Sequence, residues 1–85
     1  MRTGTQFTGT LGPNASNRWF TFGWPASWHV TWYMMPTTPK AGAPEMDWSV
    51  AVERADTDQV TYWITAKNLT NVDIAFEGRY AVLNG

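Results

Sequence analysis

The chain has 85 residues and no cysteine, so it is expected to form one domain, residues 1–85, without disulfide bonds or thiolate metal sites. Six Lys and Arg against seven Asp and Glu give a net charge of −1. A nucleic-acid-binding surface needs a basic excess on one face, so this balance argues against a nucleic-acid partner.

No apolar run approaches the roughly 20 residues of a membrane-spanning helix, and the first residues lack the apolar core of a signal peptide. We therefore expect a soluble protein. The sequons that begin at Asn14 and Asn68 are expected to carry no glycan, because no secretory signal accompanies them.

Apolar and polar residues alternate along the chain, which favours strands over helices. The first predicted strand, residues 5–11, places Phe7 and Leu11 on one face. In the second, residues 18–24, regular alternation puts Phe20 and Phe22 in the core.

The same alternation places Trp19 on the outer face of the second strand. Trp24 shares the face of Phe20 and Phe22, and it also stands next to the turn that Pro25 begins. We therefore consider Trp24 a candidate anchor for a ligand at the tip of this loop.

The third predicted strand, residues 28–35, has an inner and an outer stripe. The inner stripe is Trp28, Val30, Trp32 and Met34. The outer stripe is His29, Thr31, Tyr33 and Met35. The proline-rich segment 36–44 cannot be a central strand, and we expect it to carry the chain to another sheet or around an edge.

Three more strands are predicted at residues 46–54, 59–67 and 72–83, joined by short turns as a meander. Gly78 is a candidate bulge in the last strand. Their inward residues are expected to be Met46, Trp48, Val50, Val52, Val60, Tyr62, Ile64, Ala66, Val72, Ile74, Phe76, Tyr80 and Val82. Three side chains of interest point outward: Trp63, Glu77 and Arg79.

About six strands with alternating faces predict an all-β, antiparallel domain with one side of each sheet covered. A small β-sandwich is the first choice, and a small β-barrel is the second.

No catalytic motif is present. The only histidine, His29, follows Ser27 by two residues, but no acidic residue or nucleophile elbow is near. Two acidic pairs occur, Glu45/Asp47 and Asp56/Asp58. The second lies in a predicted turn and lacks the further acids and flanking helices of a calcium loop. A glycosidase pair of carboxylates is left open by the sequence, but a domain this small has little room for a cleft. We expect no enzymatic activity, no metal and no cofactor.

The segment 19–35 holds seven of the thirteen aromatic residues, and the outward rings are the best candidates for binding. Tryptophan also favours membrane interfaces, but no cluster of Lys or Arg accompanies these rings, so membrane insertion is disfavoured. Sugars present apolar faces ringed by hydroxyl groups, which suits a rigid indole beside polar groups.

The first hypothesis is therefore a lectin-like protein that binds a glycan or another small polar ligand and is multivalent through homo-oligomerisation. The candidate ligand-binding residues are Trp63, Tyr33, Trp19, Trp24, His29, Glu77 and Arg79. The alternative is a structural or assembly subunit whose outward Trp and Tyr residues contact other subunits.

Overall fold

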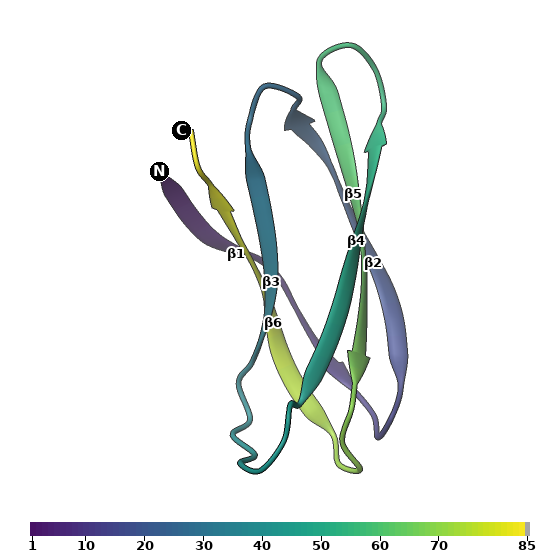
Figure 1. The fold of residues 1–85 in the computed structure, drawn as a ribbon. Coiled ribbons are helices and arrows are strands. Elements are labelled where there is room, and N and C mark those ends of the chain that lie inside the picture. Colours follow the sequence, from purple (N-terminus) through teal and green to yellow (C-terminus); the bar gives the residue numbers. More distant parts are fainter. Residues whose placement is uncertain (85) are drawn as a thin grey trace.

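The computed structural model describes residues 1–84 as two antiparallel three-stranded sheets packed face to face (Figure 1). We name each sheet after its central strand. The β6 sheet has the order β1 (Arg2–Leu11), β6 (Ile74–Val82), β3 (Val30–Pro36). The β5 sheet has the order β2 (Ser16–Pro25), β5 (Gln59–Asn68), β4 (Met46–Arg54). The all-β sandwich predicted from the sequence is confirmed.

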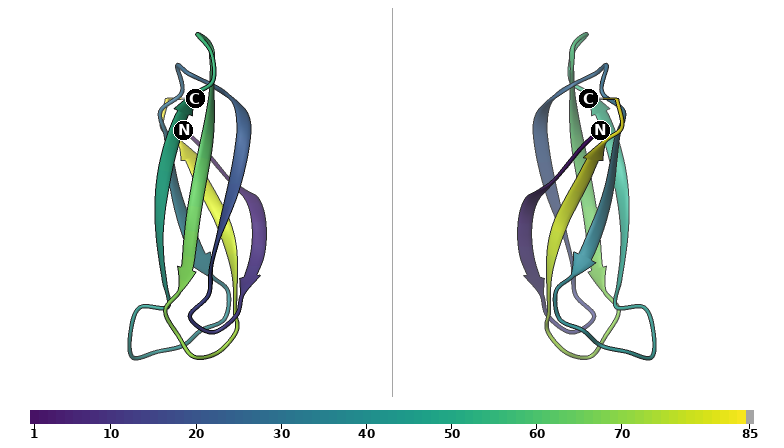
Figure 2. Two further views of the ribbon diagram at one scale, coloured as in Figure 1. Left: turned by 90° about the vertical axis from the view of Figure 1, so that its right-hand side faces the viewer. Right: turned by 90° about the vertical axis from the view of Figure 1, so that its left-hand side faces the viewer.

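The sandwich is long and narrow, with principal extents of 42 × 23 × 17 Å. Its strands run along the long axis, so the connections gather at the two ends (Figure 2). Both chain termini lie at the end that carries the β2–β3 and β4–β5 turns (Figure 1). The connections β1–β2, β3–β4 and β5–β6 lie at the other end.

The segment between β3 and β4 carries the chain from the β6 sheet to the β5 sheet, as its prolines predict. The predicted meander of the last three strands is wrong. β5 is already flanked by β2 and β4, so both of its edges are used and β6 crosses to the opposite sheet. There β6 pairs with β1 and β3 on its two sides.

A β-bulge in β2 inverts the expected faces of the residues that precede it. Thr21 is paired with Tyr62 and Trp24 with Val60, so two residues of β2, Phe22 and Gly23, stand opposite one residue of β5. Gly23 has a φ of +82°, a left-handed conformation that glycine adopts without a steric penalty.

The bulge corrects three predictions at once. Phe20 and Phe22, expected in the core, are 58% and 74% exposed. Trp19, expected outside, packs against the core. Trp24, which lies after the bulge, is on the inner face as alternation predicts and is only 8% exposed. Thus the strand keeps two tryptophans inside and turns two phenylalanines to solvent.

A second bulge lies in β1, where Gln6 is the extra residue between the pairs Thr5–Arg79 and Phe7–Gly78. Gly78 was the predicted bulge, but it is regularly paired, and the glycine serves another purpose. The Phe7 ring lies directly over it, in the space that a Cβ atom would occupy.

The centre of the core is the indole of Trp24. It meets the rings of Trp28, Trp32, Tyr62 and Tyr80 at centroid distances of 5.0–6.1 Å, all edge to face. These four aromatic residues were predicted to point inward, and each is buried or packed against the buried cluster. Burial disfavours the phenolate and raises the pKa of Tyr62 above the ordinary value of 10.0.

The core is incomplete along β4. Met46 is buried, but the next three inward residues of this strand, Trp48, Val50 and Val52, are 37%, 38% and 65% exposed. They were expected to be core residues. Their orientation is as predicted, since they oppose inward residues of β5, but the packing of the two sheets covers them only in part.

Asn68 ties two connections together at the end of the sandwich that lies away from the termini. Its side chain is completely buried. The Nδ2 group donates to the carbonyl oxygens of Leu11, Gly12 and Val72 at 2.7–3.1 Å, and Oδ1 accepts from the Thr70 N–H and hydroxyl groups at 2.8 Å. An amide so enclosed is not available for glycosylation in the folded protein.

The Phe7–Gly78 contact predicts that Gly78→Ala lowers the free energy of unfolding by about 1–3 kcal/mol, the usual effect of overpacking. Gly12→Ala is the control, because a Cβ atom there meets nothing closer than 3.9 Å. Urea denaturation measures both variants, and equal midpoints for the two would contradict the contact.

The Asn68 network predicts that Asn68→Asp costs at least about 3 kcal/mol near neutral pH, because a buried carboxylate would face three carbonyl oxygens. The loss should shrink as the pH falls and the carboxyl group becomes protonated. Asn71→Asp, at an exposed position of the same connection, should leave the urea midpoint nearly unchanged. A similar effect of both variants would refute the network.

Candidate functional site

The outer face of the β5 sheet carries three stacked aromatic rings, which we call the aromatic ladder: Phe22, Phe20 and Trp63. The Phe20 ring lies 5.1 Å from that of Trp63 and 6.3 Å from that of Phe22, with interplanar angles of 27° and 26°. Phe20 and Trp63 are directly paired across β2 and β5. The two exposed phenyl groups make this an apolar strip of the kind that marks interaction sites.

Two charged residues flank the indole of Trp63. Its Nε1 group donates to Glu53 Oε1 at 2.8 Å, from the neighbouring strand β4. On β2, the guanidinium carbon of Arg18 lies 6.0 Å from the ring centroid, at the outer limit of a cation–π contact. Together with the stacked Phe20, these contacts hold the ring in one orientation.

A shallow hollow lies beside the ladder, and we call it the Trp63 hollow. Its lining comes from all three strands of the sheet: Arg18, Ser49, Val50, Ala51, Trp63 and Thr65. In the strand register Ser49 opposes Thr65, and Ala51 opposes Trp63. The hollow therefore combines an aromatic wall, two hydroxyl groups and one guanidinium group.

A second depression continues from the first, since Ser49 and Thr65 line both. It adds Ser16, Asp47, Trp48 and Lys67. Asp47 and Lys67 are opposed in the register of β4 and β5. The Trp63 hollow and this second depression together form a trough on the outer face of the β5 sheet. The trough contains both positively and negatively charged groups.

The predicted site residues do not come together. Trp63 is in the hollow, but Tyr33, Glu77 and Arg79 lie on the other sheet. There Tyr33 opposes Arg79, and Arg79 Nε binds Glu77 Oε1 at 2.9 Å. The two groups stand on opposite outer faces of the sandwich, so one ligand of modest size cannot touch both.

The other three predicted site residues are also elsewhere. Trp19 and Trp24 both face the core, so neither presents the outward ring that a ligand platform requires. His29 is exposed in the β2–β3 turn, where its backbone N–H donates to Asn84 Oδ1 at 2.7 Å. It lies at the end of the sandwich near the termini, away from the Trp63 hollow.

The sequence did not identify Phe20, Phe22 and Arg18 as site residues, because strict alternation placed all three on the inward face of the second strand. The signal that could have found them is Gly23, since an isolated glycine within a strand pattern suggests a bulge. Ser49 and Thr65 carried no signal of their own; only the pairing of β4 with β5 brings them together.

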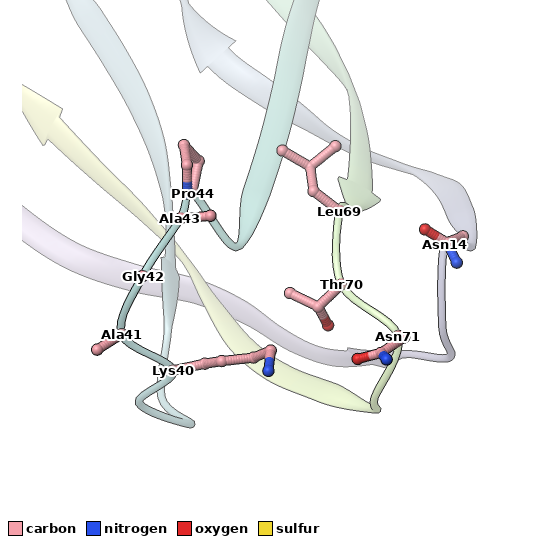
Figure 3. A pocket seen from close by; sticks show the side chains of 9 residues that line it. All are labelled: Asn14, Lys40, Ala41, Gly42, Ala43, Pro44, Leu69, Thr70 and Asn71. Carbon is pink, nitrogen blue, oxygen red and sulfur yellow. The ribbon is translucent and has the colours of Figure 1, made fainter.

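A further depression lies between the loops at the end away from the termini (Figure 3). It is formed by Asn14, by residues 40–44 and by residues 69–71, and the Lys40 side chain extends into it. No aromatic or acidic side chain lines it. It offers amides and one ammonium group, which is a poorer binding set than that of the Trp63 hollow.

Within residues 1–84 no group of His, Asp or Glu residues is arranged to hold a metal ion. Residues 1–84 contain no helix that is long and apolar enough to cross a membrane. Comparison of the chain with protein-family models, with curated proteins and with solved structures found no match. The site must therefore be interpreted from its own chemistry.

The inverted faces of β2 predict opposite effects for two residues that are three positions apart. Trp19→Ala should cost about 3–5 kcal/mol, as expected for a large aromatic side chain in a core. Phe22→Ala should cost less than about 1 kcal/mol, because its ring is mostly exposed. Urea denaturation of the two variants tests this prediction. A larger loss in the free energy of unfolding for Phe22→Ala would show that β2 alternates regularly, without a bulge.

Proposed function

We propose that this protein is a non-enzymatic binding protein that recognises a carbohydrate, or a ligand with similarly mixed surfaces, at the Trp63 hollow. The observation that carries the proposal is the fixed indole ring at a depression lined by hydroxyl groups and a guanidinium group. This is the lectin-like function expected from the sequence, but with a different set of residues around Trp63.

A sugar ring has an apolar C–H face and a rim of hydroxyl groups. The face would pack on the Trp63 indole, and the rim would meet the donors of Arg18 and the hydroxyl groups of Ser49 and Thr65. Glu53 and Phe20 already fix the indole, so little side-chain entropy is lost on binding.

The adjoining depression extends the proposed site. Asp47 can accept hydrogen bonds from ligand hydroxyl groups, and Lys67 and Ser16 can donate. The trough is shallow, which suits weak binding of an extended ligand better than tight enclosure of a single small molecule. We therefore expect oligosaccharides to bind better than monosaccharides.

The second candidate function is assembly with other protein subunits. Phe22 favours it, because a phenyl ring with 74% exposure has no polar group to offer a sugar. In the ladder the rings also stack on one another, so part of their faces is already used. Aromatic side chains at a partner interface would bury this surface completely.

The first test is a glycan array followed by titration of the best oligosaccharide, with calorimetry as the readout, because Trp63→Ala removes the fluorophore at the proposed site. Trp63→Ala should weaken binding at least about tenfold, the loss typical of a contact worth more than 1 kcal/mol. Tyr33→Ala is the matched control, because its ring lies on the outer face of the other sheet, and it should bind like the parent protein.

Three results would count against the carbohydrate proposal: an array without a ligand, full binding by Trp63→Ala, or loss of binding in Tyr33→Ala. Sedimentation analysis of Phe22→Ala separates the second candidate. If this variant dissociates an oligomer that the parent forms and sugar binding is absent, the ladder is a subunit interface.

A further inference from the structure

β4 is an edge strand that lacks most of the backbone features that prevent edge-to-edge pairing, although it carries the charged residues Asp47, Glu53 and Arg54. Such features include short length, prolines, lysines and bulges. The other three edge strands each have one: bulges interrupt β1 and β2, and β3 is short and ends at Pro36. β4 keeps a regular register with β5 from Met46 to Arg54 and contains no Pro, Gly or Lys.

The inner face of β4 is also only partly covered. Exposure along it rises from 8% at Met46 through 37% at Trp48 and 38% at Val50 to 65% at Val52. The free backbone groups of an edge and an apolar stripe thus coincide on one strand. An added strand would bind the backbone groups and shield the stripe together.

We propose that β4 pairs antiparallel with β4 of a second copy of this chain, with Ala51 at the two-fold axis. The two β5 sheets then join into one continuous sheet of six strands, three from each copy. This inference goes beyond the proposed function, since it does not depend on the identity of any ligand.

The charges of β4 disfavour registers centred on Val50 or Ser49. Registers centred on Trp48 or Val52 avoid like charges, but they pair a shorter part of Met46–Arg54 than the register centred on Ala51. Directly opposed residues point to the same side of a sheet. The two-fold axis of a symmetric pair of strands must therefore pass midway between the two copies of one residue. With Val50 at the axis, Asp47 would oppose Glu53 of the partner strand. With Ser49 at the axis, Glu45 would oppose Glu53. Like charges directly opposite one another destabilise a strand pair.

With Ala51 at the axis, no like charges meet between Trp48 and Arg54. Val50 opposes Val52 of the partner strand, which covers the most exposed apolar residues of the stripe. Ser49 opposes Glu53, and Trp48 opposes Arg54. The strand is therefore complementary to its own copy in this register, and this argues for a second copy as the occupant of the edge.

The pairing has a consequence for binding. A two-fold axis perpendicular to the sheet leaves both outer faces on the same side. Ser49 and Ala51 line the Trp63 hollow and lie on β4, so the two hollows stand next to the interface and open in the same direction. Two weak sites held in this way would bind a multivalent surface with increased avidity.

A single pair of strand edges makes a small interface, so the dimer is expected to be concentration-dependent. Sedimentation velocity over a range of concentrations should show it for the parent chain. Val52→Lys should give a monomer, since the lysines would meet the apolar stripe of the partner. Val72→Lys is the matched control: Val72 is also exposed, at 43%, but lies in the β5–β6 connection.

The register has its own test, because the chain contains no cysteine. In Ala51→Cys the two thiols would be directly opposed, with Cβ atoms roughly 4.5–5.5 Å apart, and mild oxidation should yield a covalent dimer. In Ser49→Cys the thiols would be four residues apart along the strands, roughly 14 Å, and the covalent dimer should form far more slowly.

Each outcome decides the proposal. A concentration-dependent dimer that Val52→Lys abolishes, with fast cross-linking at position 51 only, supports it. A parent chain that stays monomeric at high concentration overturns the proposal. In that case only a strand of another protein could pair with the β4 edge. A dimer that Val52→Lys leaves intact, or faster cross-linking of Ser49→Cys, overturns the interface or its register.

Discussion

The left-handed conformation of Gly23 determines which aromatic side chains of β2 are inside the sandwich. The bulge at Phe22 and Gly23 allows Trp19 and Trp24 both to face the core, although regular alternation would separate them. Trp24 then becomes the ring around which four others pack. The same bulge leaves Phe20 and Phe22 on the outer face, where they support Trp63. The core and the candidate site therefore depend on one backbone feature.

The two outer faces of the sandwich differ in kind. On the β6 sheet, β1 presents a row of threonines, and the Glu77–Arg79 ion pair lies beside them on β6. On the β5 sheet, the aromatic ladder and the Trp63 hollow lie next to one another, and the partly exposed inner stripe of β4 lies at the edge of the same sheet. A domain this small has a limited core, so surplus apolar surface is a cost unless a ligand or a partner covers it. This asymmetry is the reason why we propose the binding site on the β5 sheet.

The strands themselves could be predicted because periodic alternation and proline-rich breaks are local properties. The inward faces of β3, β5 and β6 were predicted for the same reason. The faces of β2 were not, because one extra residue reverses every side chain on one side of it. Trp48 and Val52 were oriented correctly but expected to be buried; their exposure depends on how the sheets overlap, which is not a local property. The Trp63 hollow required the pairing of distant strands, and only its indole was predicted.

The bulge in β2 can be tested through the relaxation of aromatic ring protons by an inert, soluble paramagnetic agent in the NMR spectrum of the protein. We expect strong relaxation for the rings of Phe20 and Phe22 and weak relaxation for Trp24 and Trp19. Protected phenylalanine rings in β2, together with a solvent-exposed Trp19, would show that the strand alternates without a bulge. In that case neither the core around Trp24 nor the aromatic ladder would stand.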